Sequence, residues 1–133
     1  MKKLHFKSGV RKELGPYELR SSWEANIVRY LQYMKIKFAY EPRRFYLTKK
    51  LSYLPDFQLL SDNPWNAKWL EVKGFWSKFD KRRLLTFVKK YPKETLVVIG
   101  RDKYKLLAKE YGKLIDGWEG FGKKKQEKKG TKK

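Results

Sequence analysis

Apolar residues recur at helical spacing in three stretches of the chain. In the first stretch they follow one another at steps of four, three, one and three: Trp23, Ile27, Tyr30, Leu31 and Met34. This spacing places them on one face and predicts a helix over about residues 22–35. Steps of three, one and three occur twice more, at Leu84, Phe87, Val88 and Tyr91 and at Tyr104, Leu107, Ala108 and Tyr111. We therefore expect a helix over about 78–91, ended by Pro92, and a third helix around 104–111.

Short runs rich in aromatic and branched residues lie between these helices. Residues 37–60 contain predicted strands that are broken at Pro42 and at the turn-like segment 48–50. The clearest covers about 53–60. Because Pro55 cannot donate to a ladder, this strand begins near the proline or has the proline at a position where no donor is needed. A turn at 61–64 leads to the next strand, 69–73, and completes a hairpin. Residues 95–99 are β-branched and apolar, which is typical of a strand covered on both faces, and we expect it at the sheet centre.

The resulting order of elements is α-β-β-β-α-β-α, which predicts an α/β fold with a mixed β-sheet flanked by helices. Residues 1–20 are basic, lack a sustained period and are interrupted by Gly9, Gly15 and Pro16, so they are expected to form an N-terminal arm or loop. Residues 21–118 would form one domain. Residues 119–133 are rich in lysine and predict a solvated tail.

Charge is the strongest feature of the composition. The chain of 133 residues carries 34 Lys and Arg against 14 Asp and Glu, a formal net charge of +20, which indicates a polyanionic partner such as nucleic acid. No run of about 18 apolar residues predicts a membrane span. No cysteine is available for a disulfide or a thiolate zinc site, and no apolar segment follows the basic start, so we expect a cytoplasmic protein without a membrane partner.

Two of the predicted strands bring acidic residues and a lysine together. Glu71 and Lys73 are two positions apart, so both side chains leave the same face of their strand, and Asp56 on the paired strand can join them. Asp56 and Glu71, with the Val72 carbonyl, could hold Mg²⁺, or Mn²⁺ in its place. Lys73 could orient water or stabilise charge on a phosphate. In the alternative interpretation Asp56 is a turn residue, and Glu71 and Lys73 form a surface ion pair.

The same residues resemble a nuclease signature. Pro55-Asp56 followed by Glu71-Val72-Lys73 is similar to the PD-(D/E)xK motif of nucleases with a restriction-endonuclease-like fold. Four stretches, in the same order, resemble the phage endonuclease I family, which cuts Holliday junctions: residues 20–24, 36–41, 53–57 and 71–76. The likeness covers about residues 19–100. It implies that residues 21–118 form a nuclease domain with a restriction-endonuclease-like mixed sheet, acting as an Mg²⁺-dependent endodeoxyribonuclease selective for branched DNA.

Other functions remain open at this point. A nuclease of the same fold could instead act on nicked, single-stranded or sequence-marked duplex DNA, and a non-catalytic DNA-binding module could have kept the fold. The resemblance also implies a catalytic role for Glu24 on the first helix. The residues themselves favour a capping box in that place, with Ser21 as the N-cap and Glu24 reaching back to the Ser21 amide.

Several basic residues near these motifs are candidates for contact with the DNA backbone, with solvated surface as the alternative. Together with one tryptophan they are Arg43, Arg44, Lys49, Lys50, Trp76, Lys78, Lys81, Arg82 and Arg83. His5, the only histidine, is expected to be a solvated residue of the arm. The resemblance to this family implies a strand-exchanged dimer joined through the segment before the Pro-Asp strand. The corresponding stretch 42–52 is shorter here, which argues against that exchange. A conventional homodimer stays open, and a phage-encoded protein would act in the host cytoplasm.

Overall fold

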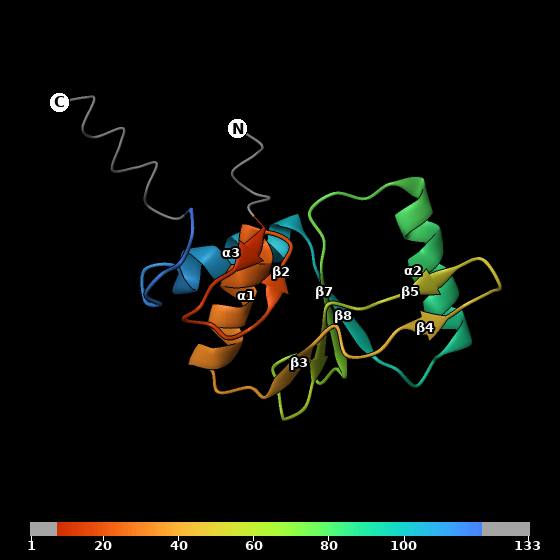
Figure 1. The fold of residues 1–133 in the computed structure, drawn as a ribbon, viewed down its shortest axis with the longest axis horizontal. Helices are drawn as coiled ribbons and strands as arrows, with labels where there is room; N and C mark the ends of the chain where they lie inside the picture. Colours follow the sequence, from red (N-terminus) through yellow and green to blue (C-terminus); the bar gives the residue numbers. More distant parts are fainter. Residues whose placement is uncertain (1–7, 121–133) are drawn as a thin grey trace. The chain divides into compact units, whose positions relative to one another are not determined.

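The computed structural model describes residues 8–120, and the chain divides into two compact units (Figure 1). In the described range, unit 1 comprises residues 8–35 and 102–120, and unit 2 comprises residues 36–101. Residues 1–7, with His5, and the predicted tail from residue 121 onward lie outside that range. Within residues 8–120, no helix has the length and apolar character needed to cross a membrane.

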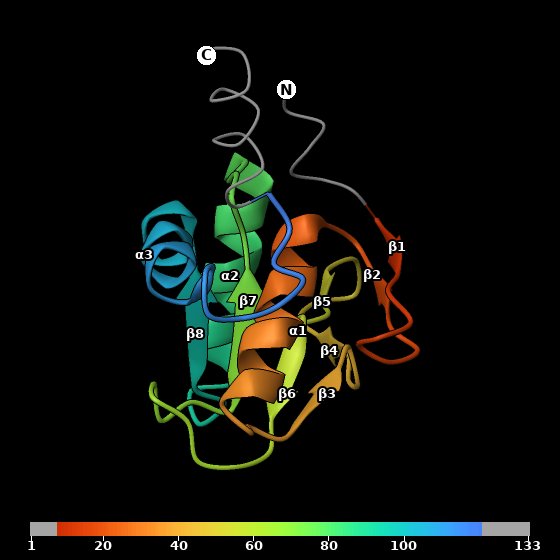
Figure 2. The same cartoon turned by 90° about the vertical axis from the view of Figure 1, so that its left-hand side faces the viewer.

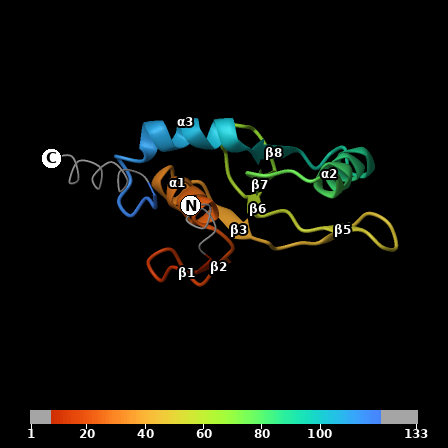
Figure 3. The same ribbon diagram turned by 90° about the horizontal axis from the view of Figure 1, so that it is seen from above.

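Unit 1 is built around two helices that run side by side, α1 (Ser22–Tyr33) and α3 (Arg101–Tyr111) (Figure 3). Trp23 stacks on Tyr104 with ring centroids 4.1 Å apart, and further along both helices Tyr30 meets Tyr111 edge-on at 5.0 Å. Both pairs are separated by the same number of residues in the sequence, so the two helices point in the same direction. The predicted first and third helices are confirmed, with ends that differ by a few residues.

A small hairpin completes unit 1 where the sequence predicted an arm or loop. Strands β1 (Gly9–Val10) and β2 (Glu18–Leu19) pair antiparallel, and the segment between them buries Leu14. Each strand is only two residues long, which is too short for an alternating pattern to be recognised in the sequence.

Unit 2 contains a four-stranded mixed sheet in the order β3-β6-β7-β8 (Figure 2). Strands β3 (Phe38–Tyr40), β6 (Phe57–Leu59) and β7 (Trp69–Val72) pair antiparallel in turn, and β8 (Leu96–Ile99) runs parallel to β7. The connection from β7 to β8 is helix α2 (Lys78–Lys90), as parallel neighbours require a crossover. The α/β class, the β6–β7 hairpin and the helix before Pro92 are therefore confirmed.

Two predictions about strands are wrong. The single strand expected over 53–60 is two strands, since β5 (Ser52–Tyr53) pairs with β4 (Phe45–Tyr46) in a separate sheet and the chain leaves that pairing around Pro55 before β6 begins. Strand β8 was expected at the sheet centre but lies at the edge. The helix crossover places this apolar strand beside β7. Among the described residues, no further strand pairs with its other edge.

The two faces of β7 have different surroundings. Trp69 is buried in an aromatic cluster between the β4–β5 hairpin and α2, with Phe45, Leu47, Tyr53 and Phe87. Figure 1 shows this hairpin lying across α2. Leu70 and Val72 point to the opposite face, because side chains alternate along a strand. Glu71 and Lys73 consequently leave β7 on the same face as Trp69, toward the hairpin and α2.

Candidate active site at the end of β7

The register between β6 and β7 sets Asp56 opposite Glu71. Phe57 pairs with Leu70, so the residue before Phe57 faces the residue after Leu70. Asp56 is buried, with 6% of its surface exposed, and its Oδ2 accepts the Val72 N–H at 2.7 Å. Asp56 thus lies at the end of β7 beside Glu71 and Val72.

Glu71 is held by two donors that converge on the same oxygen. The Tyr53 hydroxyl donates to Oε1 at 2.7 Å, and the Asp56 backbone N–H donates to the same atom at 3.3 Å. Burial, followed by the negative charge of Glu71, raises the pKa of the Tyr53 hydroxyl far above its usual value of 10.0. The Tyr53 hydroxyl therefore keeps its proton, which it donates to Glu71 Oε1.

The strand end offers oxygen atoms suited to a hard cation. In an extended strand the N–H and C=O of one residue point to the same side, so the Val72 carbonyl points to the side from which Asp56 accepts the Val72 N–H. Two carboxylates and one backbone carbonyl are the ligand types that Mg²⁺ and Mn²⁺ prefer. Within residues 8–120, no group of three or more histidine, cysteine, aspartate or glutamate side chains is placed to hold a metal ion.

Lys73 follows β7 and is fixed by both its backbone and its side chain. Its N–H donates to the Ile99 carbonyl at 3.1 Å, and its Nζ lies 3.3 Å from Asp80 Oδ2. Asp80 belongs to the capping box that begins α2, in which the Ser77 hydroxyl accepts the Asp80 N–H and Asp80 accepts the Ser77 N–H. Burial opposes ionisation of Asp80, but hydrogen bonds from Ser77 and the Lys73 charge lower its pKa overall. The N-terminus of α2 thereby positions the Lys73 ammonium.

The basic residues predicted on the hairpin side have mixed surroundings. Lys49 and Lys50 lie in the exposed turn between β4 and β5, and Arg44 is exposed with Nη1 donating to the Ser52 hydroxyl at 3.0 Å. Arg43 is engaged within the unit, since its guanidinium lies 4.1 Å from the centre of the Phe45 ring and its Nη1 4.0 Å from Glu94 Oε2. The exposed lysines and Arg44 are therefore better candidates than Arg43 for backbone contact.

The basic residues of α2 divide in the same way. Lys78, Lys81 and Arg82 are exposed. Arg83 is half-buried with its guanidinium 4.7 Å from the Phe79 ring centre, and its Nε is the one buried side-chain nitrogen or oxygen of the described residues without a hydrogen-bond partner. Trp76 is half-buried, with its ring centre 6.0 Å from the Lys73 Nζ. Trp76 thus lies beside the Lys73 ammonium, on the α2 side of the strand end.

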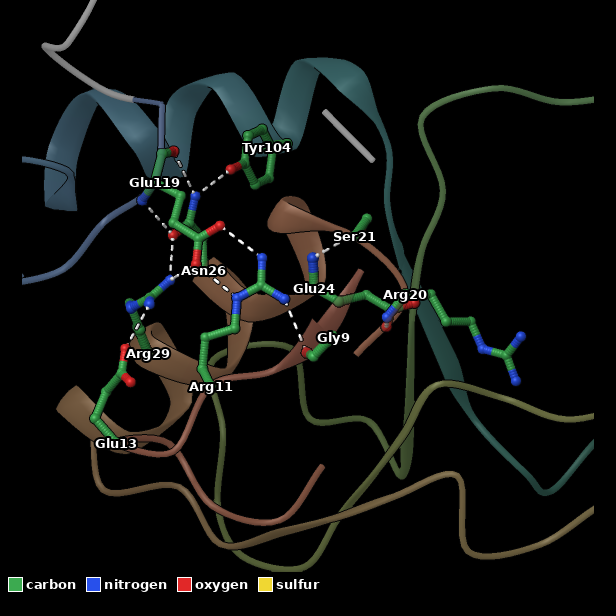
Figure 4. Close-up of polar contacts among 10 residues, drawn as sticks. All are labelled: Gly9, Arg11, Glu13, Arg20, Ser21, Glu24, Asn26, Arg29, Tyr104 and Glu119. Atoms are coloured by element: carbon green, nitrogen blue, oxygen red, sulfur yellow. Dashed lines mark hydrogen bonds and ion pairs between the residues drawn. The ribbon is translucent and has the colours of Figure 1, made fainter. Parts of the chain in front are cut away.

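Glu24 belongs to unit 1, at the start of α1. The Ser21 hydroxyl accepts the Glu24 N–H at 3.1 Å, as an N-cap should. Glu24 Oε1 accepts the Arg20 N–H at 2.9 Å, one residue before the amide that the sequence analysis expected (Figure 4). Only 5% of the Glu24 surface is exposed, which is unusual for a glutamate. The capping role of Ser21 is confirmed.

A buried polar network further along α1 joins both ends of the described chain (Figure 4). Glu119 accepts a two-point contact from Arg11 at 2.7 and 2.8 Å, and it pairs with Arg29 at 3.0 Å. Asn26, fully buried, donates to the Tyr104 hydroxyl at 2.7 Å and binds the Glu119 backbone. Glu119, assigned to the tail from the sequence, is therefore anchored in unit 1.

Tyr53 and Asp80 are contacts that the sequence analysis missed. Tyr53 was assigned only to a strand, and Asp80 was given no role on the predicted helix over about 78–91. A capping signal was available, because Ser77 stands three positions before Asp80.

Comparisons of this chain with models of known families, with curated proteins and with solved structures find no match.

Proposed function

We propose that this protein is a metal-dependent endonuclease that hydrolyses phosphodiester bonds in DNA, with Asp56, Glu71 and Lys73 as its catalytic residues. One observation carries the proposal: Asp56 and Glu71 meet at the end of β7, linked through the Val72 and Asp56 amides, with Lys73 two positions beyond Glu71 on the same face. A mere surface ion pair between Glu71 and Lys73 is not what the contacts support, since Lys73 pairs with Asp80.

Each residue has a defined task in this proposal. The Asp56 and Glu71 carboxylates, with the Val72 carbonyl, would hold Mg²⁺ or Mn²⁺. A divalent cation bound there supplies positive charge that polarises a phosphoryl oxygen and lowers the pKa of bound water. Lys73 orients the attacking water or binds a phosphate oxygen as negative charge develops. The water oxygen forms a bond to phosphorus and loses a proton, one P–O ester bond breaks, and the leaving oxygen gains a proton to become a hydroxyl.

The charge of the chain supports DNA as the substrate. A net charge of +20, and exposed cations on α2 and in the β4–β5 turn, favour binding to a phosphate backbone. Selectivity for branched DNA such as Holliday junctions rests on the resemblance to the phage endonuclease I family. Nicked, single-stranded or sequence-marked duplex DNA are the alternatives, and a non-catalytic DNA-binding module is the second candidate.

A cleavage assay tests the proposal. The full chain is given a four-way junction, a flap, a single strand and a linear duplex, each with Mg²⁺ and with EDTA. We expect cleavage of the junction that requires Mg²⁺ and is abolished by Asp56→Asn or Glu71→Gln. Both variants should bind DNA as tightly as the parent or more tightly, because each removes negative charge from the site. Binding without cleavage by the parent would favour the non-catalytic module, and cleavage in EDTA would contradict the metal site.

A further inference from the structure

Tyr53 is fixed from two directions in unit 2. It lies on β5, only 4% of its surface is exposed, and its ring meets Phe87 of α2 edge-on at 5.0 Å between ring centres. Its hydroxyl ends at Glu71 Oε1, 2.7 Å away. The ring is therefore held by the aromatic cluster, and the one polar atom of its side chain is aimed at a proposed metal ligand.

The contact constrains how Glu71 presents its oxygens. A glutamate side chain has three torsions, and the last of them, about the bond to the carboxylate, is broad when nothing binds it. Two donors, the Tyr53 hydroxyl and the Asp56 N–H, converge on Oε1 from separate elements. Two fixed donors on one oxygen restrict rotation of the carboxylate and so set the direction of the whole group.

We propose that Tyr53 is the positioning residue of the active site: its hydroxyl orients Glu71 for metal binding. This inference rests on the proposed function, because it needs Glu71 to be a ligand. Tyr53 would act through Glu71 and not on the substrate. Partners of this kind that hold a ligating carboxylate typically contribute about 10- to 100-fold to metal affinity or activity.

Tyr53→Phe is the test, since it keeps the ring in the aromatic cluster and removes only the hydroxyl. We expect the Mg²⁺ concentration for half-maximal cleavage to rise about 10- to 100-fold, with the maximal rate largely recovered at saturating Mg²⁺. Mn²⁺ binding to the full chain without DNA, followed by electron paramagnetic resonance, should weaken to the same degree. DNA affinity in EDTA should not change.

Tyr91→Phe is the matched control. Tyr91 also packs on Phe87, but its hydroxyl donates at 3.4 Å to the Tyr46 carbonyl and not to a carboxylate. This variant should leave the metal dependence unchanged. Equal weakening in both variants would mean that the effect comes from a loosened cluster, and this would overturn the assignment of Tyr53.

The outcomes also separate this inference from the proposed function. Unchanged Mn²⁺ binding in Tyr53→Phe overturns the positioning role, whatever the parent cleaves. If the parent cleaves no DNA but Tyr53→Phe binds Mn²⁺ more weakly than Tyr91→Phe does, the nuclease proposal fails and the role of Tyr53 at a metal site stands.

Discussion

Replacement of Glu119 by glutamine should destabilise the protein near neutral pH and remove part of its sensitivity to acid. Glu119 sits between two guanidinium groups, with Arg11 bound at both of its oxygens and Arg29 at 3.0 Å. Its side chain is 24% exposed. Glutamine has nearly the same shape and keeps one acceptor oxygen, so the substitution removes the charge with little change in packing.

The magnitude follows from the pKa of this carboxyl. Burial alone would raise it, but hydrogen bonds from Arg11, Ser22 and Arg29 lower the pKa of Glu119 from 4.5 to about 2. Such a difference corresponds to at most about 3.4 kcal/mol of folding free energy, and partial exposure reduces this to about 1–2 kcal/mol. Because the pKa is lower in the folded state, the stabilisation is present above pH 4.5 and is lost as the pH falls toward 2.

Urea denaturation of the full chain at a series of pH values from 7 to about 3 measures the effect. The free-energy difference between the parent and Glu119→Gln should be largest at pH 7 and should shrink below pH 4.5. Glu110→Gln is the matched control, since Glu110 is exposed on α3, and it should change stability by less than about 0.5 kcal/mol. A difference for Glu119→Gln that stays constant down to pH 3 would refute the charge argument.

Two further predictions concern function. Glu24→Gln preserves an acceptor for the Arg20 N–H, so an unchanged melting temperature with a large fall in cleavage rate would support catalysis, whereas an unchanged rate would leave Glu24 with a structural role alone. Truncation after Gly122 removes a lysine-rich segment and should flatten the slope of log DNA affinity against log salt by about 0.9 for each phosphate that the segment neutralises, with the melting temperature and any preference for branched DNA retained. Identical slopes would show that this segment does not contribute to binding.

The helices could be predicted because their periodicity is long. Five apolar positions define α1, and Pro92 marks the end of α2. Strand pairing was less accessible. The chain changes direction near Pro55, so Tyr53 on β5 pairs in a different sheet from β6. The edge position of β8 depends on which strand it pairs with after the crossover through α2. Neither event leaves a local signal in a run of four or five residues.

The candidate site shows the same division. Alternation along β7 was enough to place Glu71 and Lys73 on one face. The sequence left open whether Asp56 could join them, because that depends on the β6–β7 register, which the structure supplies. The Tyr53 hydroxyl reaches Glu71 from a different sheet, and the Tyr53 ring packs on Phe87 of α2. Such contacts arise from tertiary packing between elements far apart in the sequence. The polar network around Glu119 was missed for the same reason, because its partners come from both ends of the described chain.

The discontinuity of unit 1 has a consequence for how the protein is made. Unit 2 is one continuous stretch of 36–101, while unit 1 needs residues from both sides of it. On the ribosome, residues 36–101 have left the exit tunnel before Tyr104 and Glu119 emerge. Helix α1 meanwhile exposes Asn26 and Arg29, whose contacts with Tyr104 and Glu119 have not yet formed. Unit 2 is therefore expected to fold first, although α1 precedes it in the chain. The contacts that bury α1 would form only after Tyr104 and Glu119 have emerged.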